Sequence, residues 1–233
     1  VLIERFPLEP YRPQLIYVSP EAKGEKVYAI SGSAYINFPV SRMEIYPDFS
    51  ENPRELRKIT GTIDSVRSDK DVTIQSILIK GFASPESPYS NNERLAKGRT
   101  KSLREYVENL YHFEDGFIQT AYEPEDWAGL EKLVANSNLK HKEEILTTIH
   151  SDREPDNMEW WIKSNWPEDY KYMLKHFYPS LRRSDYTIEY TVRQYSTVKE
   201  IEEIMSTAPQ KLSLEEFYLL AQTYEDGSDE LNE

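Results

Sequence analysis

The chain has 233 residues, of which 38% are hydrophobic and 30% charged, as expected for a globular protein with its own core. Its 41 acidic and 28 basic residues give a formal net charge of −13, so we expect no nucleic-acid partner, which would need a clustered positive field. The absence of cysteine excludes disulfides, thiolate metal sites and a cysteine nucleophile. The four histidines lack metal-ligand spacing, so we expect no metal and no cofactor.

The beginning of the chain predicts little regular structure. Residues 1–26 should form an extended lead-in, because proline fixes φ and cannot donate to a sheet ladder; the prolines here are Pro7, Pro10, Pro13 and Pro20. The first residues, VLIER, lack the basic start and apolar run of a signal peptide, so we expect any signal peptide to have been removed. No run approaches the roughly 18 apolar residues that a membrane-spanning helix needs.

The next residues predict a strand, a helix and a second strand. Residues 27–38 alternate as a strand does, with packed positions expected at Tyr28, Ile30, Tyr35 and Ile36. Asn52 and Pro53 should open a helix that ends near Ser68 and buries one apolar stripe, formed by Leu56, Ile59, Ile63 and Val66. Residues 72–82, VTIQSILIKGF, are rich in β-branched residues and predict a buried strand.

The strongest helical pattern in the chain covers residues 91–111. Its core side is expected to include Leu95, Arg99, Leu103, Val107 and Leu110. A further strand is predicted at residues 117–122. The order β-α-β-α-β predicts an α+β fold in which helices cover a sheet.

The rest of the chain is predicted to be mainly helical. Residues 124–180 form a helical insertion, with helices expected near 127–134, 143–149 and 158–177. Residues 185–195, DYTIEYTVRQY, alternate and should return to the sheet as a strand. From Thr197 the chain is expected to be helical again, in two pieces broken near Pro209.

One segment carries a resemblance to a known family. Residues 81–103, GFASPESPYSNNERLAKGRTKSL, resemble the OmpA-C-like, peptidoglycan-associating consensus: a strand, G-H-T-D, a short loop, N-x-x-L-S-x-x-R-A and a helix. The strand-end glycine, loop asparagine, leucine and arginine of that consensus match Gly81, Asn92, Leu95 and Arg99. Ala96 stands at the serine position and Thr100 at the alanine position. Residues 181–186, LRRSDY, are similar to the family's N-R-R-V-E-I before its last strand.

This resemblance implies an OmpA-C-like domain over residues 27–195, with helices on one face of the sheet. In the family, the arginine pairs with a carboxylate of the diaminopimelate side chain of peptidoglycan, and the aspartate of G-H-T-D binds its ammonium. Arg99 matches the arginine, but Ser84 stands at the aspartate position and carries no charge. Losing that contact would remove about 1.5–3 kcal/mol of binding unless Glu86 replaces it.

Asn92 completes the set of residues assigned to this site. We expect it to cap or brace the loop whatever the ligand. An alternative role for Arg99 is structural, as an arginine that bonds loop carbonyls and anchors the turn between strand and helix.

The resemblance extends to OmpA-family proteins of Bacteroidetes, commonly encoded near fimbrial or outer-membrane genes. Residues 212–233 look like the start of a tetratricopeptide-type repeat, which would need further repeats to bury its face. The resemblance implies a non-enzymatic, periplasmic, outer-membrane-associated protein. Such a protein would tether an envelope or fimbrial assembly to peptidoglycan, or serve as an interaction scaffold for other envelope proteins.

Two other hypotheses follow from the residues of the insertion and its surroundings. Trp160, Trp161 and Trp166 suggest sugar stacking, but neighbouring helical residues point about 100° apart, and a core role is favoured. Adjacent acids such as Glu114–Asp115, Glu125–Asp126 and Glu168–Asp169 are interpreted as solvated surface, since no histidine or nucleophile motif organises them for catalysis.

Overall fold

The computed structural model describes residues 24–39 and 42–224. The chain divides into two compact units, which are described separately. One unit comprises residues 27–193, and the other comprises residues 1–26 with 194–233. Of the expected lead-in, residues 1–26, the first 23 lie outside the described residues, and Lys26 already belongs to strand β1.

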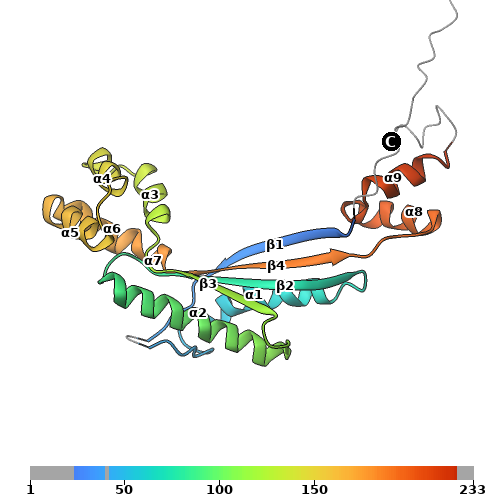
Figure 1. Ribbon diagram of the computed structural model, residues 1–233, viewed down its shortest axis with the longest axis horizontal. Helices are drawn as coiled ribbons and strands as arrows, with labels where there is room; N and C mark the ends of the chain where they lie inside the picture. The colour runs from blue at the N-terminus through green and yellow to red at the C-terminus, as the bar shows by residue number, and fades with distance from the viewer. Residues whose placement is uncertain (1–23, 40–41, 225–233) are drawn as a thin grey trace, which may run out of the picture. The chain divides into compact units, whose positions relative to one another are not determined.

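The larger unit contains a mixed sheet of four strands in the order β1-β4-β2-β3 (Figure 1). Its strands are β1 (Lys26–Ala34, whose first residue belongs to the other unit), β2 (Val72–Phe82), β3 (Ile118–Glu123) and β4 (Ser184–Val192). Strand β2 is parallel to β3 and antiparallel to β4, with a register shift between Ile74 and Ser76. Strand β1 is antiparallel to β4. Tyr28 near the start of β1 stacks on Tyr190 near the end of β4, whereas Ser33 near the end of β1 bonds to Asp185 near the start of β4.

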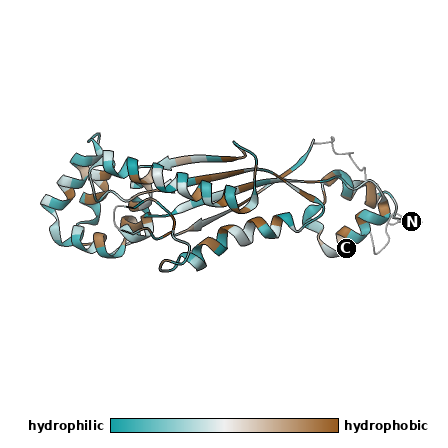
Figure 2. Cartoon of the chain, turned by 90° about the horizontal axis from the view of Figure 1, so that it is seen from below, coloured by the Kyte–Doolittle hydropathy of each residue, from teal (hydrophilic) through white to brown (hydrophobic). Residues whose placement is uncertain are grey.

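Helices α1 (Asn52–Arg67) and α2 (Tyr89–Tyr111) cover one face of this sheet (Figure 1). The α+β class and the one-sided helical cover are therefore confirmed. The core residues come from every strand and both helices: Ala34, Ile36, Leu56, Ile59, Ile63, Ile77, Ile79, Leu103, Val107, Ile118, Tyr186 and Ile188. In Figure 2 hydrophobic and hydrophilic residues alternate along the helices, as expected for helices with one buried side.

Four residues expected to be packed are placed differently. Leu110 is 51% exposed and Leu95 is only partly buried, because α2 turns a different side to the sheet, formed by Asn92, Ala96, Thr100, Leu103 and Val107. Ile30 and Tyr35 are also exposed, at 41% and 39%. Ile30 lies on β1, an edge strand with a sheet neighbour on one side only, and Tyr35 lies just beyond that strand.

Gly81 explains the rotation of α2. A Cβ at Gly81 would lie 1.9 Å from Oγ1 of Thr100 and 3.4 Å from the carbonyl oxygen of Ala96. The helix backbone thus lies directly against the end of β2, where only small residues fit. Ala96 and Thr100 fill this contact and displace the larger Leu95 from the core.

The chain between β3 and β4 forms five helices: α3 (Trp127–Ala135), α4 (Lys142–Ile149), α5 (Pro155–Asn165), α6 (Pro167–His176) and α7 (Tyr178–Leu181). They enclose a second core, made by Leu130, Val134, Ile145, Ile162, Tyr170, Met173, Tyr178 and Leu181. The insertion is joined to α2 by the carboxylate of Asp156, in the first turn of α5, which accepts a 2.7 Å hydrogen bond from the backbone N–H of Tyr89. The start of α2 has no side-chain cap from its own N-cap residue, Pro88.

The smaller unit contains α8 (Val198–Thr207), a short 3-10 helix (Pro209–Lys211) and α9 (Leu214–Ala221). Its centre is the buried carboxylate of Glu216, which accepts hydrogen bonds from Nζ of Lys26 at 3.0 Å and from the N–H of Tyr195 at 2.7 Å. Ser213 and Glu216 also form a capping box at the start of α9. The end of the repeat-like segment, residues 225–233, lies outside the described residues. Within the described part of the chain, no helix is both long and apolar enough to cross a bilayer.

Candidate functional site

A small pocket of about 20 Å³ lies where the end of β2, helix α2 and the start of β4 meet. Three arginines and two phenylalanines contribute to its wall, which consists of Ile36, Phe38, Gly81, Phe82, Ala96, Arg99, Arg182, Arg183 and Ser184. Backbone hydrogen bonds fix the loop beside it. The N–H of Phe82 donates to the carbonyl of Arg183 at 2.8 Å, and the N–H of Ala83 donates to the carbonyl of Glu123 at 3.1 Å. The pocket is therefore built on a rigid support.

Arg99 reaches the pocket from α2 without an anionic partner among the described residues. Its guanidinium carbon lies 4.9 Å from the centroid of the Phe38 ring, and its Nε is buried without a hydrogen bond. Burial, together with the nearby charge of Arg182, lowers the pKa of Arg99, which remains a cation at neutral pH. An unpaired donor of this kind is costly to bury, and a bound anion would satisfy it.

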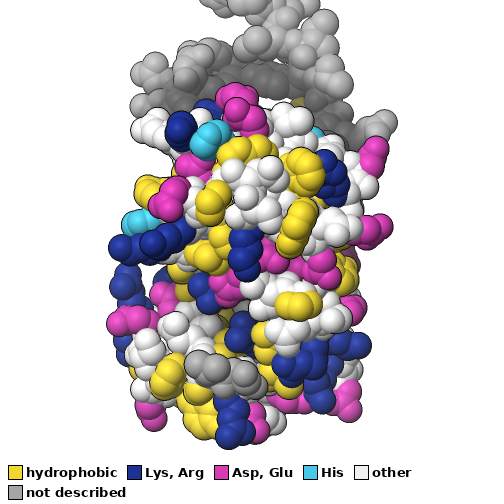
Figure 3. Space-filling model, turned by 90° about the vertical axis from the view of Figure 1, so that its left-hand side faces the viewer, with side chains coloured by type: hydrophobic (Ala, Val, Ile, Leu, Met, Phe, Trp, Pro, Cys, Tyr) yellow, Lys and Arg dark blue, Asp and Glu magenta, His cyan; other side chains and the backbone are white. Residues whose placement is uncertain are grey.

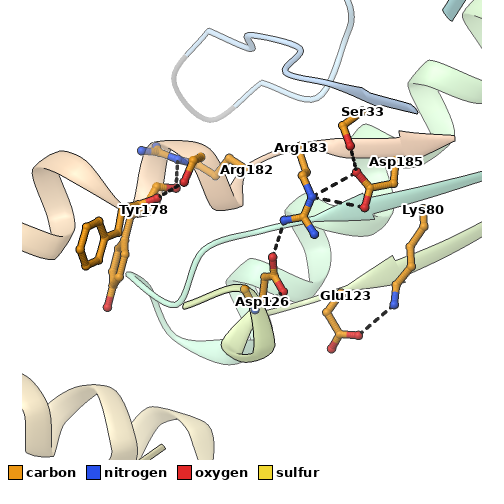
Figure 4. A network of polar contacts seen from close by, with 11 residues as sticks. Ser33, Lys80, Glu123, Asp126, Tyr178, Arg182, Arg183 and Asp185 are labelled. Carbon is orange, nitrogen blue, oxygen red and sulfur yellow. Dashed lines mark hydrogen bonds and ion pairs between the residues drawn. The ribbon is translucent and has the colours of Figure 1, made fainter. Parts of the chain in front are cut away.

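The other two arginines of the pocket already have carboxylate partners. Arg183 pairs with Asp126 and, at 3.1 Å, with Asp185, so it bridges the start of the insertion and β4 (Figure 4). Its guanidinium carbon also lies 4.0 Å from the Phe82 ring centroid. Burial acts to lower the pKa of Arg183, but the hydrogen bond and charge of Asp126 outweigh it, and the pKa is raised.

Two residues assigned to the site by resemblance, Ser84 and Glu86, do not line this pocket. Ser84 is buried, and its hydroxyl makes no hydrogen bond to a described residue. The carboxylate of Glu86 pairs at 3.2 Å with Arg182, which belongs to the pocket wall, and its charge also acts on Arg99. Among the described residues, no acidic side chain lines the pocket.

Asn92 braces the loop and does not cap the helix. Its amide donates to the carbonyl of Ser87 at 2.7 Å and to the buried carboxylate of Glu125 at 2.9 Å. Trp127 donates to the same carboxylate at 2.8 Å. Burial raises the pKa of Glu125, and these two hydrogen bonds oppose that shift.

The sequence interpretation missed Phe38, Arg182 and Arg183 as pocket residues. The two arginines stood in the matched segment LRRSDY, and their adjacency just before the last strand was the available signal. Phe38 had no such signal, because only the path of the chain after β1 brings its ring against Arg99.

The adjacent acids also differ from the interpretation. Glu125, Asp126 and Asp169 are buried, and each has a structural partner. The side chain of Asp126 accepts from the N–H of Gly129 at the start of α3, and Asp169 lies 2.7 Å from Nδ1 of His141. Among the described residues, no group of three or more acidic or histidine side chains is placed to hold a metal ion.

The tryptophans of the insertion are only partly in its core. Trp166 packs against the second core, as favoured by the sequence, but Trp160 is 62% and Trp161 37% exposed. The core prediction was wrong for both, because the buried side of α5 is formed by Met158 and Ile162.

No family model and no curated protein matches this sequence.

Proposed function

We propose that this protein is a non-enzymatic, periplasmic tether that holds an envelope or fimbrial assembly to peptidoglycan through the Arg99 pocket. The observation that carries the proposal is Arg99 itself, a half-buried guanidinium without an anionic partner among the described residues, facing a preformed pocket. A guanidinium fork binds a carboxylate through two parallel, charge-assisted hydrogen bonds. Peptidoglycan stems offer such carboxylates, and the resemblance of residues 81–103 to the OmpA-C-like family points to the same ligand.

The residues around Arg99 also limit the kind of ligand that the pocket can bind. Phe38 covers part of the guanidinium, and every other charged group of the pocket wall is paired with a carboxylate. The pocket is thus suited to a ligand group that carries only a carboxylate, more than to a zwitterion, because Ser84 offers no negative charge to an ammonium. The proposed contact is between Arg99 and a stem-peptide carboxylate.

A second candidate function is an envelope interaction scaffold in which the peptidoglycan pocket has degenerated. The pairing of Glu86 with Arg182 favours it, since this leaves no acidic residue of the described chain for the ammonium role. In that case the insertion and the C-terminal helices would bind other envelope proteins.

Co-sedimentation with purified sacculi tests the proposal. We expect the wild-type chain to sediment with sacculi and Arg99→Ala to weaken this binding roughly ten- to hundred-fold, the usual effect of losing a charge-assisted hydrogen bond. Lys101→Ala is the matched control, because it removes the same charge from an exposed position on the same helix. A further control uses sacculi from which an amidase has removed the stem peptides. The wild-type chain should bind these stripped sacculi no better than the Arg99→Ala variant binds intact sacculi.

If the wild-type chain stays in the supernatant at low and moderate salt, the tether proposal fails and the scaffold replaces it. Equal losses in Arg99→Ala and Lys101→Ala would also contradict it, since they would indicate a general charge effect. Thermal unfolding of each variant shows that the fold is retained.

A further inference from the structure

A second pocket lies within the helical insertion, between α4 and α5. Its volume is about 290 Å³, and its wall combines two indole rings with polar side chains: Glu144, Thr147, Thr148, Ser151, Arg153, Trp161 and Trp166. All of these residues belong to the larger unit. In Figure 3, which views the structure from the insertion end, hydrophobic side chains are interspersed with charged ones.

The two indole rings are held in place by neighbouring groups. The guanidinium carbon of Arg153 lies 4.3 Å from the ring centroid of Trp161, and Trp166 stacks on His141 at 6.1 Å between centroids. Trp161 is still 37% exposed, so part of its ring is open to a ligand. The electron-rich face of an aromatic ring attracts weakly positive C–H groups, such as those on one face of a pyranose.

The polar rim offers both acceptors and donors. The hydroxyls of Thr147 and Ser151 donate to the carbonyls of Glu143 at 2.8 Å and Thr148 at 2.7 Å, which leaves their lone pairs as acceptors. The carboxylate of Glu144 adds a further acceptor. The guanidinium of Arg153 and the indole N–H of Trp161 are donors, and neither donates a hydrogen bond to a described residue.

We propose that this pocket binds a pyranose ring of a glycan. A sugar has an apolar C–H face for the indoles and hydroxyls that both donate and accept, and this combination matches the wall of the pocket. The site needs no carboxylate on the ligand. It is therefore independent of Arg99 and of the proposed tether.

The test is a titration of the full, ¹⁵N-labelled chain, followed through the indole N–H signals of its four tryptophans. The probes are the tetrasaccharides of N-acetylglucosamine, glucose and mannose, each at millimolar concentration. We expect at least one of them to shift the signals of Trp161 and Trp166 while the signal of Trp127 stays in place. Trp161→Ala should lower the affinity by about tenfold, and Trp161→Phe should retain part of it.

Trp160→Ala is the matched control, because Trp160 is the adjacent residue and does not line the pocket. It should leave the affinity unchanged, as should Arg99→Ala. The proposal is overturned if none of the three sugars moves the Trp161 or Trp166 signal. Equal weakening by Trp160→Ala and Trp161→Ala would overturn it too, as would loss of sugar binding in Arg99→Ala.

Discussion

Gly81 and Thr100 show how one close contact positions Arg99. Since Thr100 and Arg99 are neighbours on α2, the distance between this helix and β2 determines where the guanidinium lies. The consensus-like glycine at the end of the strand therefore has a packing role that is separate from any ligand.

Gly81→Ala should destabilise the larger unit by about 1–3 kcal/mol, because the new Cβ would overlap Oγ1 of Thr100. In the double variant Gly81→Ala/Thr100→Ala the overlapping hydroxyl is gone, so most of this loss should be regained. Urea unfolding of both single variants and the double variant measures the coupling. Simple additivity of the two single effects would show that the two side chains do not compete for the same space.

At the scale of elements, Glu216 holds α9 to the start of β1 and to the segment before α8. Burial acts to raise the pKa of Glu216, but hydrogen bonds from the N–H groups of Ser213 and Tyr195 and from Lys26 outweigh it, so the pKa is lowered. A carboxyl group with a lowered pKa stabilises the folded state above its unfolded pKa. This contribution is lost as pH falls through the folded pKa.

We therefore expect amide exchange in α9 to accelerate as pH falls below about 4.3, relative to its intrinsic rate. Glu216→Gln should abolish this dependence and cost about 3–5 kcal/mol in local stability, because Lys26 would remain buried without a counter-charge. Hydrogen exchange measured by mass spectrometry over this pH range is the readout. The neighbouring Glu215→Gln, at a side chain without a hydrogen bond to any described residue, should behave as wild type.

Local patterns predicted most of these elements, and tertiary contacts decided the rest. The apolar stripe of α1 was predicted in full from its spacing of three and four residues. All four of its members are buried: Leu56, Ile59, Ile63 and Val66. On α2 the burial of Leu103 and Val107 was predicted, but the burial of Ala96 and Thr100 was not, because it depends on the contact at Gly81. Arg99 was found through a linear motif, whereas the pocket around it required Phe38 and Arg183, which reach it through long-range packing.

At the scale of the whole molecule, the two hydrophobic cores and the Arg99 pocket are built only from residues of the larger unit. Residues 27–193 alone should therefore fold and unfold cooperatively. Thermal unfolding followed by near-ultraviolet circular dichroism, with the full chain as reference, tests this. A broad transition without fixed aromatic signals would show that the smaller unit is needed for folding.

The hydrogen bond between Asp156 and the backbone of Tyr89 bears on protein engineering. It supplies an acceptor to the first turn of the helix that carries Arg99, at a position where Pro88 offers none. A shortened relative designed by joining β3 directly to β4 would lose that acceptor along with the five helices. Transplanting the Arg99 pocket onto another scaffold thus requires carrying the insertion with it, or designing a new cap for α2.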